Sequence, residues 1–295
     1  MGDRVDNRSE VREFLTSRRA RVTPEQVGLP TTGGRRVEGL RRTEVAGLAG
    51  VSVEYYTRLE RGNLQGASES VLDALARALQ LDEAERAHLF DLARSAGATP
   101  RTRRRPAPQR VRPGIERVVD AIAAPAWVRN GRSDFMASNL LARALYAPVF
   151  DQINSMQSPA NTARFAFLDE WARAFDVDWE RTADDIVGVL RAEAGRNPYD
   201  RGLTDLVGEL STHSDDFRVR WARHDVQFHR TGTKRLHHPV VGGMDLTYEA
   251  MEFPSDPGLT LLVYTAEAGT PTHDALTLLA SWAATIDRQE ELADS

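Results

Sequence analysis

The sequence lacks cysteine altogether and has a single lysine, Lys234, among its 295 residues. Without cysteine the chain can form no disulfide and can use no thiolate as a nucleophile or metal ligand. No apolar run approaches the roughly 20 residues that span a bilayer, and none has the form of a secretory signal peptide. We therefore expect a soluble, cytoplasmic protein that does not enter a membrane.

Motifs that carry common chemistry are missing too. There is no G-x-S-x-G sequence and no phosphate-cradling glycine loop, since Gly242 and Gly243 precede an expected strand rather than a helix. Four histidines could suggest a metal, but their spacings match no compact ligand set. They are His224, His229, His237 and His238. We predict no enzyme activity, no metal and no cofactor.

The net charge of −5 is unevenly distributed along the chain. Residues 1–113 hold 21 arginines against 15 acidic residues, a charge of +6, which leaves −11 for residues 114–295. Neutralising phosphates supplies much of the affinity of a protein for DNA, and an acidic body is repelled from the duplex. This uneven distribution of charge favours a basic DNA-binding head joined to an acidic body. The alternative is a chance asymmetry of the solvated surface.

Residues 40–62, LRRTEVAGLAGVSVEYYTRLERG, have the pattern of two short helices joined by a tight turn. The first predicted helix, residues 42–49, has small apolar side chains on one face. Gly50 can take the left-handed backbone that ends it, and Ser52 can cap a second helix that runs to about residue 60. This is the helix-turn-helix layout, whose second helix enters the major groove of DNA. A plain helical hairpin is the alternative.

The exposed face of the second predicted helix carries side chains suited to DNA. Arg58 can address guanine or a phosphate, Val53 can touch a thymine methyl, and nearby hydroxyls can reach base edges or phosphates. Other arginines are expected along the phosphates. The predicted DNA-binding residues are Arg35, Arg36, Arg41, Arg42, Ser52, Val53, Glu54, Tyr55, Thr57, Arg58 and Arg61. The predicted partner is double-stranded operator DNA, palindromic if the protein is a homodimer.

Three further predicted helices complete a five-helix head over residues 1–96. They are residues 9–19, 68–81 and 82–95, each with apolar side chains at helical spacing. Residues 22–39, rich in proline and glycine, are expected to form a long loop. Residues 97–114 hold four prolines and six arginines but no acid, a composition that cannot fold alone. This composition predicts a basic linker. The linker either makes an extra contact to DNA or serves only as a hinge.

The remaining residues, 115–295, mix strand and helix patterns. Strands are predicted at 126–130, 134–138, 240–253 and 259–266. Helices are predicted at 140–146, 161–175, 179–194, 198–212, 214–223 and 272–284. We expect an α+β body with one antiparallel sheet and helices packed over a face.

Two stretches of the sequence resemble known families. The segment from EFLTSRRARVTPEQVGLP through GLRRTEVAGLAGVSVEYYTRLERG resembles the Xre-type, Cro/repressor-like helix-turn-helix heads. The body, with NGRSDFMASNLLARALY, RNPYDRGLTDLVGELS and LVYTAEAGTPTHDALTLLASWA, resembles the MmyB-type ligand-binding domain that follows such heads. The resemblance implies a lambda-repressor-like head and a PAS-like body with an apolar pocket for a fatty acid or similar small molecule.

Large aromatic side chains are spread over the predicted body, as a mainly apolar ligand pocket requires. An arginine or histidine facing such a pocket would suit a carboxylate. The predicted ligand-binding residues are Trp127, Asn130, Phe135, Asn139, Tyr146, Arg164, Phe167, Trp171, Trp221, His224 and Tyr248. The alternative for each aromatic residue is that it fills the core.

These patterns predict a sequence-specific transcription regulator that acts at the nucleoid. In the first hypothesis it is a homodimer whose body binds a small apolar ligand, such as a fatty acid, and resets the geometry of two DNA-reading heads. In the second, the pocket is filled by the protein's own side chains, and the acidic surface recruits a partner such as RNA polymerase. An enzyme with a DNA-binding appendage is the third.

Overall fold

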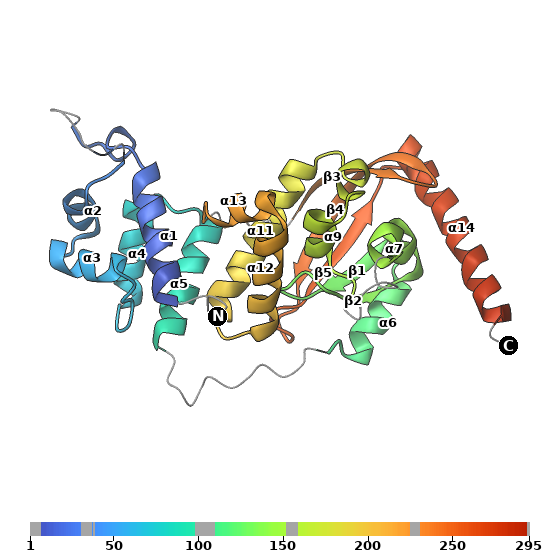
Figure 1. Cartoon of the computed structure of the whole chain (residues 1–295), viewed down its shortest axis with the longest axis horizontal. Helices are drawn as coiled ribbons and strands as arrows, with labels where there is room; N and C mark the ends of the chain where they lie inside the picture. Colours follow the sequence, from blue (N-terminus) through green and yellow to red (C-terminus); the bar gives the residue numbers. More distant parts are fainter. Residues whose placement is uncertain are drawn as a thin grey trace. The chain divides into compact units, whose positions relative to one another are not determined.

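The computed structural model describes residues 7–30, 37, 39–97, 110–151, 159–224 and 231–293 of the chain (Figure 1). The chain divides into two compact units. The first, the head unit, comprises Met1–Pro106, Arg191–Glu209 and Arg218–Gln227, and the second, the body unit, comprises Ala107–Leu190, Leu210–Phe217 and Phe228–Ser295. A helical head and an α+β body confirm the predicted fold class. The domain boundaries along the chain stay a prediction.

Five helices form the amino-terminal part of the head unit, as predicted. They are α1 (Asn7–Arg21), α2 (Arg42–Ala49), α3 (Val53–Glu60), α4 (Glu69–Ala78) and α5 (Glu83–Gly97). Their shared core includes fully buried Phe14, Val45 and Leu89. The predicted loop at 22–39 contains a short 3-10 helix, η1 (Glu25–Val27), and its residues 31–36 and 38 lie outside the described part of the chain.

The turn between α2 and α3 has the predicted geometry. Gly50 has a φ of +66°, a left-handed conformation that a side chain would make costly. Two residues later, the Ser52 Oγ accepts a hydrogen bond from the Tyr55 backbone N–H at 3.1 Å and so caps α3. Local residue choices therefore set the angle between the two helices.

A buried carboxylate ties α3 to the rest of the helical head. Glu60, only 1% exposed, accepts a hydrogen bond from Arg19 Nε of α1 at 2.5 Å and another from Arg42 Nε of α2. The Tyr56 hydroxyl donates to the same carboxylate at 3.3 Å. Arg19 also donates to the Leu40 carbonyl, at the entry to α2. One buried carboxylate thus holds three helices together.

Replacing Glu60 with Gln should destabilise the helical head by roughly 3 kcal/mol, because two arginines then lose the buried charge that balances them. Urea denaturation followed by circular dichroism at the helical band measures the change. Glu54→Gln, an exposed position on the same helix, is the matched control and should change the free energy of unfolding by less than about 0.5 kcal/mol. Equal effects of the two substitutions would contradict the role given to Glu60.

The body unit contains one five-stranded sheet. Its strands are β1 (Ala126–Arg129), β2 (Phe135–Ser138), β3 (Thr231–His238), β4 (Gly242–Glu252) and β5 (Thr260–Thr265). The order is β2-β1-β5-β4-β3 and each neighbouring pair is antiparallel. With the helices of residues 140–221 inserted between β2 and β3, this is the PAS-like arrangement that the family resemblance implies.

Strand β3 was not predicted from the sequence, and β4 begins at Gly242 rather than at residue 240. The sequence of β3, TGTKRLHH, has few apolar residues because it lies at the edge of the sheet and half of its residues are exposed. Only Leu236 and His238 are buried in it. An edge strand of this kind lacks the alternation that identifies a half-buried strand.

The two faces of the sheet differ in what covers them. In β1, Trp127 and Arg129 point to one face, and Ala126 and Val128 point to the other, because side chains alternate along a strand. The second pair packs in a cluster with Ile115 and other residues. Ile115 belongs to α6 (Pro113–Ala121), a helix that the sequence reading did not predict and that begins within the predicted linker. The expectation of helices over a single face was therefore incomplete.

The other helices follow β2 and β5. They are α7 (Leu140–Leu145), α8 (Ala147–Asp151), α9 (Thr162–Leu168), α10 (Ala172–Phe175), α11 (Trp179–Arg196), α12 (Arg201–His213), α13 (Asp215–Trp221) and α14 (Pro271–Ala293). The single helix predicted at 161–175 was wrong, since it breaks into α9 and α10 where the Asp169 carboxylate accepts a hydrogen bond from the Trp171 backbone N–H. No helix in the described residues is both long and apolar enough to cross a membrane.

Candidate functional site

The first candidate surface lies on α3 and the turn that follows it. Six residues line one shallow depression there: Val53, Glu54, Thr57, Arg58, Arg61 and Asn63. The first five were predicted to contact DNA. Asn63 was not, although its place just after the glycine that follows α3 could have indicated it. The structure thus brings half-buried and exposed polar side chains together on the face predicted to read the major groove.

Several side chains on this surface have local partners that fix their positions. The Thr57 hydroxyl donates to the Val53 carbonyl at 2.7 Å, and the Ser52 hydroxyl is used as the helix cap. The Arg58 guanidinium lies over the Tyr55 ring, 4.7 Å from its centre. That contact orients an exposed cation without neutralising it. Arg58 is therefore the side chain on α3 best placed to donate to a base or a phosphate.

The arginines predicted along the phosphates differ in their surroundings. Arg42 donates a hydrogen bond to the Glu60 carboxylate, which raises the pKa of the Arg42 guanidinium. The Arg42 side chain therefore stabilises the head. It is also about half exposed to solvent. Arg41 is exposed at the start of α2. Arg35 and Arg36 lie outside the described residues. DNA contacts by these four residues stay a prediction.

Replacing Arg58 with Ala should weaken binding to the cognate site by about 1–3 kcal/mol without loss of fold, because one good base contact carries that much discrimination. Fluorescence anisotropy with a panel of site variants would show relaxed specificity at one position. An equal loss on every sequence would assign Arg58 to phosphate contact, and no loss at all would contradict the docking of α3 in the groove. Arg77→Ala on α4 is the matched control.

The second candidate site is a pocket in the body unit, between one face of the sheet and the helices α8 to α11. It encloses about 130 Å³. Strands β1, β4 and β5 supply Trp127, Tyr248 and Tyr264 to its wall. Phe165 and Phe175, from α9 and α10, face them. Most of the lining is therefore aromatic or aliphatic, as expected for a site that takes an apolar group.

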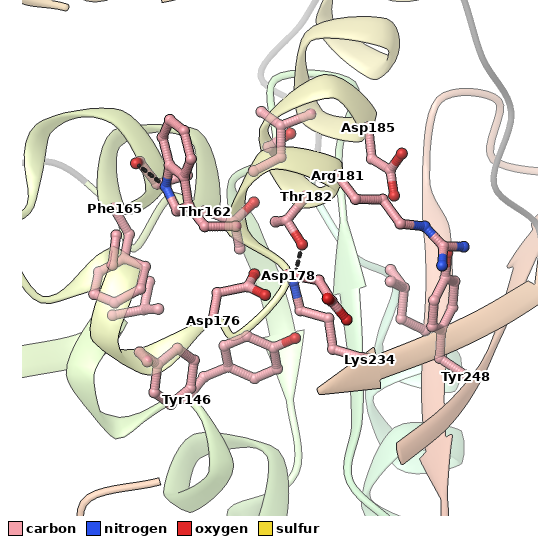
Figure 2. A pocket seen from close by; sticks show the side chains of 18 of the residues that line it. Tyr146, Thr162, Phe165, Asp176, Asp178, Arg181, Thr182, Asp185, Lys234 and Tyr248 are labelled. Carbon is pink, nitrogen blue, oxygen red and sulfur yellow. Dashed lines mark hydrogen bonds and ion pairs between the residues drawn. The ribbon is translucent and has the colours of Figure 1, made fainter. Parts of the chain in front are cut away.

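The opposite side of the pocket is charged. Figure 2 shows Phe165 and Tyr146 on one side, Arg181 and Tyr248 on the other, and the Lys234 ammonium between them. Lys234, the single lysine of the chain, donates to the Asp176 carboxylate and to the Thr182 hydroxyl, the latter at 2.6 Å. This lysine is thus already neutralised by a neighbouring acid.

Arg181 differs from Lys234 because, among the described residues, it makes no ion pair with a carboxylate at close range. Its side chain is exposed, and its guanidinium lies beside the Tyr248 ring (Figure 2). Burial raises the pKa of the Tyr248 phenol, and the charge of Arg181 opposes that rise. Arg181 is the cation at the pocket with the most capacity left for an anion.

Two buried polar atoms of the lining lack a partner in the described part of the chain. Trp127 is 2% exposed, and its indole N–H makes no hydrogen bond of normal geometry. The N–H nevertheless faces the Tyr264 phenol and opposes the rise in the pKa of that phenol that burial causes. One carboxylate oxygen of Asp176, Oδ1, is likewise buried and without a hydrogen bond. The lining therefore offers one buried donor and one buried acceptor to a polar group in the pocket.

Two tyrosines form the polar centre of the aromatic wall. The Tyr146 and Tyr264 hydroxyls lie 2.7 Å apart and share a hydrogen bond. Burial raises the pKa of Tyr264 to about 12 and that of Tyr146 well above its usual value. Both phenols are therefore neutral near pH 7, and they offer one remaining hydrogen to a ligand between them.

The predicted pocket residues Phe135, Asn130 and Asn139 have other surroundings. Phe135 stacks on Trp127 with ring centres 3.9 Å apart, but it does not line the pocket itself. Asn130 is buried and donates to Asp134 at 2.8 Å, which shapes the turn between β1 and β2. Asn139 caps α7 and donates to carbonyls of the preceding loop. The asparagines fix the backbone around the pocket.

Of the remaining predicted pocket residues, Trp127, Tyr146 and Tyr248 line the pocket, and five others do not. Arg164 is half buried on α9, and Phe167 packs edge-on against the rings of Trp179 and Phe217. Trp171 is 67% exposed. Trp221 and His224 belong to the head unit. The lining residues Arg181, Lys234 and Asp176 were missed because isolated charges in a sequence do not show which cavity they share.

His224 takes part in the one group of potential metal ligands found among the described residues, together with Glu10 and Glu13. Their ligand atoms lie within 4.8 Å of one another. However, the Arg191 guanidinium lies 2.5 Å from a Glu10 oxygen and 2.8 Å from His224 Nδ1, so a cation already occupies this position. The prediction of no metal stays a prediction.

Two family models match the chain. Residues 111–279, more than half of the chain, match the MmyB-like transcription regulator ligand binding domain, and residues 10–89 match a helix-turn-helix domain. No curated protein matches the chain with significant similarity. The matches confirm the resemblance seen in the sequence to a helix-turn-helix regulator with an MmyB-like body. The finer assignment of the head to the Xre class stays a prediction.

Proposed function

The chain belongs to the family of MmyB-like transcription regulators, and from that premise we propose that it is a homodimer that binds a palindromic operator and senses a small apolar carboxylate. The helix-turn-helix domain and the ligand-binding domain define a DNA-binding regulator with a sensor. The proposal adds the class of ligand, a fatty acid or a similar molecule, and the site of action at the nucleoid in the cytoplasm.

The observation that carries the ligand class is the pairing of an aromatic cavity with Arg181. An apolar tail would lie against Trp127, Phe165 and Phe175, and a carboxylate would receive hydrogen bonds from the guanidinium. The unpartnered indole N–H of Trp127 supplies a further donor. This combination of one apolar wall and a few placed polar groups is typical of sites for small molecules.

The volume of the pocket limits the ligand's size. Pockets for drug-sized ligands enclose roughly 300–1,000 Å³, whereas an apolar cavity of about 150 Å³ holds a molecule the size of benzene. A pocket of about 130 Å³ therefore admits a short chain or a ring. A long fatty acid would have to displace side chains of the lining, at the cost of packing contacts.

A series of saturated fatty acids tests the proposal directly. Octanoate should raise the melting temperature of the full-length protein more than hexadecanoate does, and the shift should grow with the logarithm of its concentration above the dissociation constant. Differential scanning fluorimetry measures both. Native mass spectrometry of the protein as purified should show a retained carboxylic acid. An absence of any thermal response across the series, with no retained mass, would contradict the sensor.

The variant Arg181→Gln supplies the matching test of the headgroup. It should weaken octanoate binding about tenfold to a hundredfold, because a charge-assisted hydrogen bond contributes about 1.5–3 kcal/mol. Octanamide, which has the same tail but no charge, should bind the variant and the unchanged protein alike. Arg117→Gln, an exposed change on α6 away from the pocket, is the control. If the variant lost as much affinity for octanamide as for octanoate, Arg181 would not bind the carboxylate headgroup.

The small volume also favours the second candidate function, a regulator controlled by protein contacts. In that case the pocket is packed core, the acidic surface of the body binds a partner such as RNA polymerase, and no small molecule is needed. Ala166→Leu, at a buried lining residue, separates the two functions. Adding bulk there should cost about 1–3 kcal/mol of stability if the space is filled by protein atoms, and much less if it is vacant.

A further inference from the structure

Two aspartates of the pocket lining, two residues apart, use their carboxylate oxygens differently. Asp178 is half-buried, and both of its oxygens accept hydrogen bonds from Arg235, one of them from Nε at 2.7 Å. Asp176 is 5% exposed, and its Oδ2 accepts a hydrogen bond from Lys234. Its Oδ1 is buried and has no hydrogen bond within the described residues. Asp176 therefore keeps one acceptor for a group that enters the pocket.

Strand β3 sets where this acceptor lies relative to Arg181. A Cβ at Gly232 would be 3.3 Å from a terminal nitrogen of Arg181, so the guanidinium lies against that position of the strand. Asp176 forms a backbone bridge with Leu236, four residues further along β3. A strand rises about 3.3 Å per residue, so the two positions are about 13 Å apart along β3. The Asp176 carboxylate lies beside the Lys234 ammonium, and Arg181 lies further away (Figure 2).

The surroundings of the Asp176 carboxylate are aromatic. Phe165 and Phe175 line the same pocket. Burial raises the pKa of Tyr146, and the charges of Tyr264 and Asp176 add to that rise, so the carboxylate lies close to the paired phenols. An apolar ligand in this space would exclude water from Asp176 Oδ1 without replacing its hydrogen bond. Leaving a buried polar group unpaired is costly, and a site with such a group therefore discriminates against ligands that have no donor.

The ion pair with Lys234 decides what kind of donor fits. Lys234 already balances the charge of Asp176. A ligand ammonium at Oδ1 would bring a second positive charge into a buried place without a second anion. A hydroxyl brings no charge, and its own oxygen can accept the remaining hydrogen of the tyrosine pair. A neutral hydroxyl is thus the donor that suits this position.

We propose that the ligand of the pocket is a hydroxylated acid, whose hydroxyl donates to Asp176 Oδ1 while its carboxylate lies at Arg181. This inference rests on the proposed function, which puts the carboxylate at Arg181. Because of the spacing along β3, the hydroxyl belongs in the half of an eight-carbon chain that is farther from the carboxylate. A hydroxyl on the carbon next to the carboxylate does not reach Asp176.

Isothermal titration calorimetry of the full-length protein tests the position of the hydroxyl. The ligands are octanoate, 2-hydroxyoctanoate and the four isomers with a hydroxyl on carbons 5 to 8. At least one of the four should bind about tenfold to a hundredfold more tightly than octanoate, because a hydrogen bond to a charged group contributes that much. 2-Hydroxyoctanoate should bind about as tightly as octanoate. A gain below tenfold for all four isomers, or an equal gain for 2-hydroxyoctanoate, would overturn the proposal.

The double variant Asp176→Ala with Lys234→Met assigns the gain to Asp176. It removes both members of the ion pair, so no unpaired charge stays buried. The gain from the hydroxyl should fall below about threefold. Asp178→Ala with Arg235→Met is the matched control, because both oxygens of that carboxylate are already in use, and the gain should remain. Equal losses of the gain in the two double variants would contradict the role of Asp176. If the first double variant does not fold, the ligand series in the unchanged protein still decides.

Methyl esters separate this inference from the proposed ligand class. Methyl octanoate and the methyl ester of the best hydroxy isomer carry no charge for Arg181 and differ only in the hydroxyl. The hydroxy ester should bind about tenfold more tightly than the plain ester. If the acids do not bind but the esters keep this difference, the carboxylate is contradicted and the hydroxyl site stands. If octanoate binds and no hydroxyl improves it, this inference alone is overturned.

Discussion

An arginine without exposed surface needs a countercharge inside the protein, and the pair that Arg191 forms with Glu10 is the interaction on which the head unit depends. It joins α1 to the part of α11 that belongs to the head unit. Losing either member would leave an uncompensated buried charge, which is far more costly than losing a surface ion pair. A steric requirement adds to this electrostatic one, because a Cβ at Gly195 of the same helix would lie 2.5 Å from the buried His88 ring.

The pocket of the body unit follows from the alternation of its strands. Trp127 and Arg129 turn to the helices on one face of the sheet, while Ala126 and Val128 pack under α6 on the other. The aromatic side chains therefore gather on the face where α11 and the residues just before it bring charged groups such as Asp178 and Arg181. A site with an apolar wall and a charged rim arises from this meeting of strand periodicity and helix packing.

Features set by neighbouring residues could be predicted from the sequence, and features set by distant ones could not. The turn at Gly50 and the Ser52 cap depend on residues a few positions apart, and both were predicted. Strand β3 escaped because an exposed edge strand shows no apolar alternation. His224 was expected in the pocket, but its partner is Arg191, 33 positions away, and no local pattern reveals that pairing.

Hydrogen exchange of the full-length protein, with and without octanoate and in the absence of DNA, tests the central claim most directly. Exchange reports local opening of each helix separately, so it can locate a binding site. If the pocket of the body unit binds octanoate, the ligand will slow exchange in the helices that line the pocket, α9, α10 and α11. Unchanged exchange in these helices at saturating octanoate would contradict the account.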